Sequence, residues 1–508
     1  SARQHCMRDV GLVRSRITIG SGGLGLAGGA ARVSLLSRRD GGYASSRLVA
    51  CAAGDDVRRS GKRSHDDAKQ SRQLQKPRRK RNRSTSNKDS AAKLLNARIV
   101  KARNDGEVAD IVRQHVGEFN EIHVSTAANK LAKLTARRHT ITLSKSQRDS
   151  VLLLLEERLH DFESISARPV ANLLWSCAKL GYDDGNHSMV HYLSDQVPRV
   201  VDDFNPQTLA NTVWAWATMR HQPSADSLAA LERRVLACVD DFKPQNLANT
   251  LWAIAMLINS IEGDSITCRP TRRVMRLWGT TAIDQNVLDQ LLHRLEHAAQ
   301  LRSLEEQAFQ QILQAHHLLG DRFKPSAALL DRSCKAWEKS LLSSQTLSQS
   351  SFGKEVAACL DRLGVKYELD VVTEDGMHRI DILVRTTAGD NTQQQQHMLA
   401  IACDGPEHFM RSCYDTYHID GSTFARNYEL SDLGFDVLCI AVHKWRMLKT
   451  DDERDNYMRS ELLKFWCRIF GCFLLCLSEM TCDNTEEVCD TNTGEIWFDP
   501  RYLKYGYV

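Results

Sequence analysis

The residues best suited to chemistry stand at the end of an apolar run, Leu399 to Cys403. Asp404 follows this run directly, Gly405 and Pro406 turn the chain, and His408 comes two residues later. A short apolar run bounded by turn residues is typical of a buried strand. Because α/β folds place functional groups at strand ends, this acid and histidine predict a functional site.

A second acid stands in a second predicted strand. Asp381 lies between apolar neighbours in the run from Arg379 to Val384, and Glu374 to Gly376 supply a turn before it. Carboxylate oxygens are ligands that Mg²⁺ prefers. Two acids at adjacent strand ends can share a metal ion, so Asp381 and Asp404 are candidate metal ligands.

Residues 351 to 466 resemble a RAP domain. The hallmark of that domain is a strand that ends in Asp-Gly-Pro-x-His-Phe, and this string is present from Asp404 to Phe409. The run from Gly434 to Ala441 is similar to the later strand of the domain, and Val442 to Trp445 to the aromatic segment after it. The resemblance implies an organellar protein of RNA metabolism. It also implies a C-terminal domain similar in fold to PD-(D/E)XK nucleases, including the very-short-patch repair endonuclease.

The order of predicted elements agrees with the αβββαβ order of that nuclease fold. Apolar periodicity and turn residues predict a helix, three strands, a helix, a strand and a final helix. Their expected bounds are 351–363, 366–372, 378–385, 398–403, 422–433, 435–442 and 453–466.

The resemblance further implies a catalytic set. In active nucleases of this fold, a helix Glu and two strand acids hold a divalent cation, and a lysine activates water. Glu355 fills the helix position and Asp381 the first strand position. With Asp404 they form a set that can hold Mg²⁺, and His408 is the candidate base of an endoribonuclease.

Two positions depart from the nuclease pattern. Ala402 stands where the second strand acid is expected, and Asp404 stands where the lysine is expected. The alternative interpretation is structural: Asp404 caps the turn, and His408 packs against Phe409. We therefore expect a non-catalytic domain that needs no cofactor, with Mg²⁺ required only if the nuclease is active.

Residues 106 to 340 contain a helical repeat. Three copies share an Ala-Asn pair followed by Trp, at spacings of 39 and then 38 residues, and weaker copies flank them at 127–132 and 306–315. The three copies are Ile165 to Ala178, Phe204 to Ala217 and Phe242 to Ala255. Pro206 and Pro244 stand at the first helical position, where a missing N–H costs nothing. The pattern in each copy predicts a helical hairpin, and we expect the hairpins to stack into an α-solenoid.

The Leu-Ala-Asn-x-x-Trp-Ala motif at this period resembles the octotricopeptide repeat, a helical-repeat family of organellar RNA-binding proteins. Helical repeats followed by a RAP domain are also similar to the FAST kinase-related family, which acts on organellar transcripts. Both resemblances imply single-stranded organellar RNA, either mRNA or rRNA, as the partner.

Residues that read bases should differ between repeats, because identical readers would specify a single base. The shared Asn and Trp are therefore interpreted as architecture, with Trp in the inter-repeat core and Asn bonded to neighbouring backbone. They are Asn172, Asn211 and Asn249, and Trp175, Trp214 and Trp252. The readout candidates vary between copies and lie near the helix start, where N–H donors are free. They are Arg168, Gln207 and Gln245 at one position, and Pro169, Thr208 and Asn246 at the next.

Basic charge is concentrated at the N-terminus. Residues 1 to 103 hold 25 Lys and Arg against 7 Asp and Glu, a net charge of +18, so the remainder carries −14 within the chain total of +4. An acidic body argues against binding RNA by bulk charge, because that affinity scales with the phosphates neutralised. Any RNA binding by the body must depend on local patches and stacking.

The N-terminal composition predicts targeting and disorder. Residues 1–50, rich in Arg, Ser, Gly and Ala, are typical of an organellar transit peptide. Residues 51–105 predict a basic disordered linker, whose Arg78 to Arg81 is either an RNA-binding or import patch or a solvated extension. A loop at 259–285 contains Arg272 and Arg273, which either contact phosphates or belong to a solvated charge run.

The expected organisation is thus a transit peptide, a linker, a solenoid at 106–340, a RAP domain at 341–466 and an extension at 467–508. No run of about 18 apolar residues predicts a membrane span, and the cysteines predict free thiols in a reduced compartment. The preferred location is the mitochondrial matrix, with the plastid as alternative. The preferred function is organellar RNA processing, transcript stability or rRNA maturation, in association with an organellar ribosome or RNA granule. An endoribonuclease and a structural subunit of an organellar ribosome are the alternatives.

Overall fold

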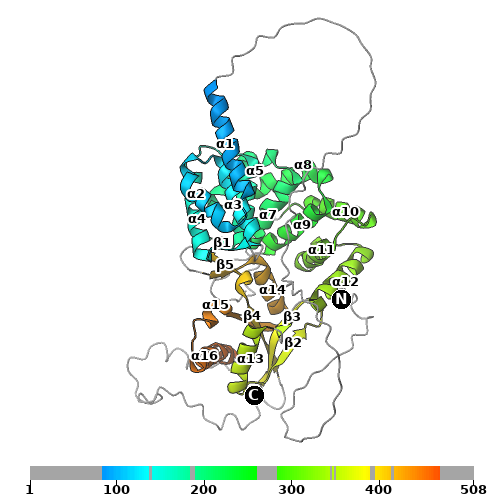
Figure 1. The fold of residues 1–508 in the computed structure, drawn as a ribbon. Helices are drawn as coiled ribbons and strands as arrows, with labels where there is room; N and C mark the ends of the chain where they lie inside the picture. The colour runs from blue at the N-terminus through cyan, green and yellow to red at the C-terminus, as the bar shows by residue number, and fades with distance from the viewer. Residues whose placement is uncertain are drawn as a thin grey trace, which may run out of the picture. The chain divides into compact units, whose positions relative to one another are not determined.

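The computed structural model describes residues 83–469 except 137–139, 184–188, 260–282, 344–345, 348–349, 389–394 and 413–416. The described chain is mostly helical up to residue 343, and a smaller α/β region follows (Figure 1). This confirms the predicted order of a helical region and a C-terminal α/β region. Contacts divide the described chain into two compact units, residues 83–334 with 404–431, and residues 335–403 with 432–469.

The helical region consists of two layers. Helices α3, α5, α7, α9 and α11 pack side by side in sequence order, and α6, α8 and α10 pack against them as a second layer. This agrees with the predicted stack of hairpins. The bounds are α1 (Arg83–Lys101), α2 (Asp105–His115), α3 (Glu121–Thr135), α4 (Lys145–Leu159), α5 (Ala167–Leu180), α6 (Met189–Val200), α7 (Pro206–Met219), α8 (Ala225–Cys238), α9 (Pro244–Asn259), α10 (Gln285–Gln300), α11 (Glu306–Leu319) and α12 (Ala327–Ser343).

The turn before α7 shows how a repeat begins. Phe204 is buried, and its N–H closes a short 3₁₀ turn on the carbonyl of Val201. Asn205 then caps α7 by accepting from the backbone N–H of Thr208 at 2.9 Å, and Pro206 takes the first helical position, as predicted. From the second layer, Arg234 Nε donates to the carbonyl of Phe204 at 2.9 Å. The turn is therefore fixed by backbone and side-chain bonds together.

Helix α1 lies inside the stretch predicted as a disordered linker. Leu95 and Ile99 are spaced by one helical turn, and both are buried. His123 of α3 contacts the carbonyl of Ala92 through Nε2 at 2.8 Å, and Lys130 Nζ donates to the carbonyl of Val100 at 2.7 Å. This stretch has few apolar residues, which is why disorder was predicted. Its last part is nevertheless helical because Leu95 and Ile99 are buried and α3 bonds its backbone.

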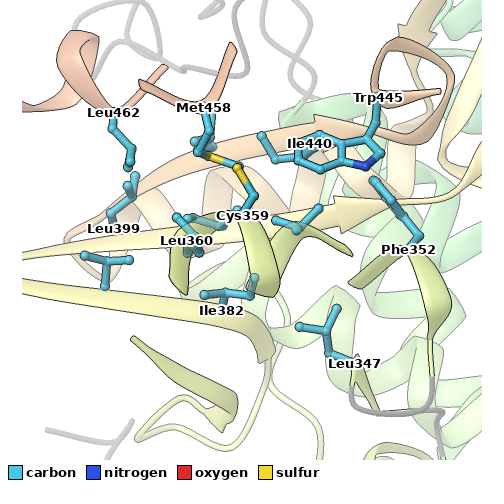
Figure 2. Close-up of a cluster of buried hydrophobic side chains, with 14 of the residues drawn as sticks. Leu347, Phe352, Cys359, Leu360, Ile382, Leu399, Ile440, Trp445, Met458 and Leu462 are labelled. Carbon is cyan, nitrogen blue, oxygen red and sulfur yellow. The ribbon is translucent and has the colours of Figure 1, made fainter. Parts of the chain in front are cut away.

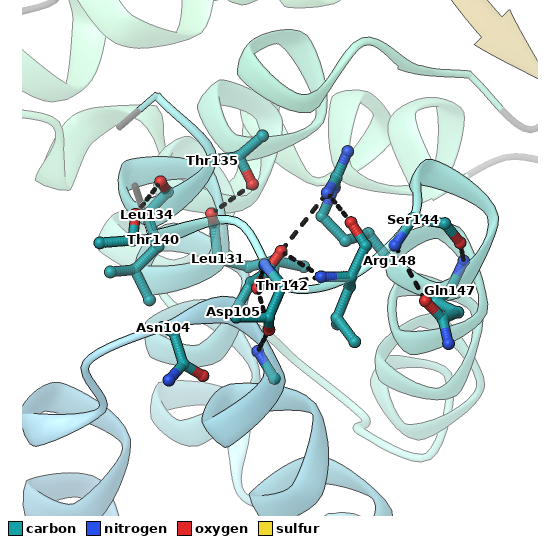
Figure 3. Close-up of polar contacts among 12 residues, drawn as sticks. Asn104, Asp105, Leu131, Leu134, Thr135, Thr140, Thr142, Ser144, Gln147 and Arg148 are labelled. Carbon is teal, nitrogen blue, oxygen red and sulfur yellow. Dashed lines mark hydrogen bonds and ion pairs between the residues drawn. The ribbon is translucent and has the colours of Figure 1, made fainter. Parts of the chain in front are cut away.

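The start of α2 is fixed by a buried carboxylate (Figure 3). Asp105 is 0% exposed, and its oxygens accept from the backbone N–H and the hydroxyl of Thr142, at 2.6 and 2.7 Å, and from the N–H of Leu143. Arg148 lies 3.4 Å from the same carboxylate. Burial opposes ionisation, but these hydrogen bonds outweigh it and lower the pKa of Asp105.

The unit of residues 335–403 and 432–469 is built on a four-stranded sheet. The strand order is β2-β3-β4-β7, with β3 antiparallel to both β2 and β4. Along the chain the predicted elements occur in the expected order, with the short strands at 409–412 and 417–419 added before the helix at 421–432, and strand bounds differ from those expected by up to three residues. The bounds are α13 (Ser351–Arg362), β2 (Glu368–Val372), β3 (Arg379–Ala388), β4 (Gln395–Asp404), β7 (Phe435–Ala441), α15 (Val442–Trp445) and α16 (Asp451–Ile469).

The core of this unit lies between the sheet and the helices α13 and α16 (Figure 2). Ile382 and Leu399, from neighbouring strands, are buried against Leu360 of α13 and Met458 of α16. Trp445 is 0% exposed in the same cluster. Burying such side chains contributes about 1.5–3 kcal/mol each, which holds the strand ends in place.

Residues 404–431 belong to the same compact unit as the helical repeats. They form β5 (Phe409–Ser412), β6 (Tyr417–Ile419) and most of α14 (Gly421–Asp432). β5 pairs with β6 and, in parallel, with the two-residue strand β1 (Tyr182–Asp183) that follows α5. One division between the two units, at residues 334 and 335, lies close to the predicted boundary at 340, whereas residues 404–431 of the predicted RAP domain group with the helical repeats.

None of the helices in the described ranges combines the length and apolar composition that crossing a bilayer requires. Cysteines in the same ranges, among them Cys177 and Cys359, are free thiols.

Candidate nucleic-acid interface

Asp404, the last residue of β4, is paired with an arginine. Its side chain is 1% exposed, and the guanidinium of Arg426 in α14 donates to both carboxylate oxygens, at 2.9 and 3.1 Å. The same guanidinium donates to Asn427 Oδ1 at 2.9 Å. A bidentate pair is among the strongest contacts that a carboxylate makes with a side chain. The negative charge of Asp404 is thus compensated within the protein.

His408 supports the start of α14. Its Nδ1 lies 2.9 Å from the hydroxyl of Thr423, and its carbonyl accepts from the N–H of Asp420 at 2.9 Å. Asp420 in turn accepts from the N–H of Thr423 at 2.8 Å, which makes it the cap of the helix. Burial raises the pKa of Asp420, and the Thr423 N–H and the charge of His408 act in the opposite direction. The contacts of His408 therefore hold the first turn of α14 in position.

Side-chain contacts at the end of β4 lead to α14. Asp404 pairs with Arg426, and His408 Nδ1 lies within hydrogen-bond distance of the Thr423 hydroxyl. We name these two contacts, Asp404–Arg426 and His408–Thr423, the strand-end pairs. Together they tie the end of β4 to α14.

The other two candidate catalytic acids have partners of their own. Glu355 Oε2 accepts from the indole N–H of Trp445 at 3.1 Å and lies 3.6 Å from Arg454. Asp381 Oδ2 accepts from the backbone N–H of Cys403 at 2.8 Å. Within the ranges that the structure describes, no three His, Cys, Asp or Glu side chains are grouped to hold a metal ion.

Helix α14 packs across the C-terminal ends of several repeat helices. A side chain at Gly421 would collide with the carbonyl of Ala217 at the end of α7, so glycine is required there. The guanidinium of Arg220 stacks 4.0 Å from the ring centroid of Phe424. Phe424, Ala425 and Tyr428 also line a small pocket together with Met256 of α9 and Leu318 of α11.

The readout candidates fall into different environments. Arg168 and Gln207 are exposed near the starts of α5 and α7. Thr208 is buried, and its hydroxyl bonds Asn205, while Asn246 is 9% exposed. Gln245 is half-buried and bonds neighbouring amides. Arg272 and Arg273 lie outside the described residues.

The shared asparagines are not bonded to backbone as expected. Asn249 Oδ1 accepts from Gln245 Nε2 and from Gln311 Nε2, each at 2.9 Å, so it joins α9 to α11 through side chains. Asn172 and Asn211 are half-buried, and the described residues provide no hydrogen-bond partner for either amide. The shared tryptophans are buried as predicted, with exposures of 7%, 5% and 1% for Trp175, Trp214 and Trp252.

Comparison with known proteins identifies the C-terminal region. The RAP domain family model matches residues 401–461. A chloroplastic RAP domain-containing protein of Oryza sativa subsp. japonica is 28% identical over 160 residues. That alignment covers 28% of this chain and 24% of the relative, so the match spans about a quarter of the length of that protein. The chain therefore carries a RAP domain, which follows a row of stacked helices.

Proposed function

We propose that this protein binds single-stranded RNA and acts in organellar RNA processing, transcript stability or rRNA maturation. The observation that carries the proposal is one chain that joins a RAP domain to stacked helical repeats. RAP domain proteins are a family of RNA-binding proteins. Stacked helical repeats offer an extended surface for a polymer, and modular RNA repeats read single strands along such a surface.

Contacts at the strand end favour binding over cleavage. A metal ion at Asp404 would compete with the bidentate guanidinium of Arg426. At His408 the Nδ1 atom is engaged by the Thr423 hydroxyl, so a general base there would have to act through Nε2. Cleavage through Glu355, Asp381, Asp404 and His408 with Mg²⁺ is therefore the outcome against which binding is tested.

Crosslinking of the full chain in cells, followed by sequencing of the bound RNA, tests this function. A few discrete transcripts would support a regulator of processing or stability. Ribosomal RNA recovered throughout a sedimenting particle would instead support a structural subunit of an organellar ribosome. Recovery of no RNA above background would contradict RNA binding in either role.

The proposed location is an organelle. The N-terminal composition and the FAST-like order of domains favour the mitochondrial matrix, whereas the relative from Oryza sativa is chloroplastic by name. Imaging the full chain with a C-terminal fluorescent tag, against markers of both organelles, distinguishes the two. A signal that overlaps neither marker would contradict an organellar role.

A further inference from the structure

Two faces of helix α7 differ in what they contact. Trp214 and Trp216 are two residues apart, which places them about 200° apart around the helix axis. Trp216 is 0% exposed and donates its indole N–H to Ser194 of α6 at 2.8 Å, so its face packs on the second layer. Asn211 lies three residues before Trp214, on the same face as that residue. The Asn211 face is therefore turned away from the second layer.

Equivalent asparagines extend this face across neighbouring helices. Asn129 of α3, Asn172 of α5 and Asn211 of α7 align in the sequence repeat, and these three helices pack side by side. All three residues are half-buried, and no hydrogen bond to their side-chain amides is found within the described part of the chain. We name these three residues the open amide row.

The same row is closed at its other end. Asn249 on α9 is 5% exposed and is bonded by Gln245 and Gln311. Gln245 Nε2 also donates to Gln311 Oε1 at 3.1 Å. Each amide at the α9–α11 end therefore has a side-chain partner, although Gln245 Oε1 is left unpaired, whereas no hydrogen bond to the amides on α3, α5 and α7 is found among the described residues.

Buried tryptophans lie beside the asparagines at both ends of the row. The indole N–H groups of Trp175, Trp214 and Trp252 are buried and have no hydrogen-bond partner among the described residues. Each Trp lies on the face of the Asn three residues earlier. Lys179 Nζ is 4.5 Å from the ring centroid of Trp214 and 6.0 Å from that of Trp175. The ammonium group of Lys179 therefore places positive charge beside these rings, which favours an anionic polymer on this face.

We propose that the open amide row is the site where the repeats hold the RNA strand without discriminating between bases. A side-chain amide both donates and accepts, so it can bond the edge of any base, and identical amides offer the strand the same contact at every repeat. This inference rests on the proposed RNA binding and assigns a binding role to asparagines interpreted from sequence as architecture.

Fluorescence anisotropy with the full chain tests the row. Labelled oligo(U), oligo(A) and oligo(C), each about 20 nucleotides long, are titrated with the parent protein and with the triple variant Asn129→Ala, Asn172→Ala, Asn211→Ala. At about threefold per hydrogen bond, we expect binding weaker by about 30-fold, by a similar factor for all three RNAs. The matched control is Asn286→Ala, which removes an exposed asparagine from the second-layer helix α10 and should leave each Kd within twofold.

Each outcome decides a separate question. If the parent binds none of the three RNAs, base-independent binding fails, and the proposed function is decided separately by crosslinking in cells. If the parent binds and the folded triple variant binds within twofold of it, the amide row fails. A loss confined to one RNA would show sequence readout and contradict base-independent binding.

Ultraviolet crosslinking of the parent covers the case in which the triple variant does not fold. Peptides from α5 and α7 should carry crosslinked nucleotides when mapped by mass spectrometry. Crosslinks found solely on other helices would overturn the assignment.

Discussion

The strand-end pairs and the open amide row lie in one compact unit, and they use polar side chains in opposite ways. Asp404 and His408, whose types suggest catalysis, are bonded to Arg426 and Thr423. Asn172 and Asn211, whose type suggests packing, have no partner for their amides within the described residues. A charged group that is buried needs a partner, whereas a half-buried amide can be left for a ligand.

The difference between these two regions shows where function can reside. A carboxylate that is 1% exposed and paired with a guanidinium stabilises the fold, and it is poorly placed to bind a metal ion or a substrate. The amides of adjacent helices are half-buried and recur from one helix to the next. Polymer binding benefits from many weak and equivalent contacts, so we locate RNA binding in the repeats.

The largest expected effect comes from breaking a strand-end pair. Asp404→Ala leaves the guanidinium of Arg426, 22% exposed, without its carboxylate. Removing one partner of a buried pair costs about 3–5 kcal/mol, so we expect a loss of about 3 kcal/mol in the free energy of unfolding. Chemical denaturation of the full chain measures it.

The double variant Asp404→Ala, Arg426→Ala is the control for this pair. It should lose less stability than the two single variants added together, because neither charge is left alone. A single-variant loss below about 1 kcal/mol would mean that the pair is not structural, and the contrast with the amide row would disappear.

Removing the charge of a second buried carboxylate, Asp105, should lower the free energy of unfolding by a smaller amount, and this loss should depend on pH. Asp105→Asn keeps the shape of the side chain but removes the charge that accepts from Thr142 and lies near Arg148. We expect a loss of about 2 kcal/mol at neutral pH. Equilibrium unfolding of the variant and the parent, measured at pH 7, checks it.

The sign of the pH dependence follows from the lowered pKa of Asp105. Its stabilisation is present above the ordinary carboxyl pKa of about 3.8 and is lost as pH falls through the folded-state value. The difference in stability between parent and Asp105→Asn should therefore shrink in acid. A difference that stays constant from pH 7 to pH 2 would contradict this explanation.

The smallest expected effect tests the closed end of the amide row. Gln311→Leu removes the bonds that Gln311 makes to Gln245 and Asn249. We expect a loss of about 1 kcal/mol, seen as a lower melting temperature of the full chain. Gln314→Leu, a half-buried glutamine on the same helix, is the matched control and should change stability less.

Local sequence rules predicted much of the fold. Pro206 and Asn205 marked the start of α7 because a proline at the first helical position and an Asn cap each satisfy a known backbone requirement. The strands β2, β3, β4 and β7 were predicted from apolar runs between turn residues. These elements follow from neighbours in the chain.

Long-range partners were not predictable. The two residues of β1 pair with β5 more than 200 residues away, and Arg426 stands 22 residues after Asp404 on a different element. The sequence shows the residue types but not which of them meet. Asn249 and Gln311, 62 residues apart, were missed for the same reason.

One measurement tests the central claim that the protein binds RNA without cutting it. Labelled single-stranded RNA is incubated with the full chain in Mg²⁺ or Mn²⁺, and binding and strand length are followed together. We expect a retarded complex that contains intact RNA, with binding weakened in the triple asparagine variant. A metal-dependent cleavage product that Asp381→Ala or Asp404→Asn abolishes would contradict the account.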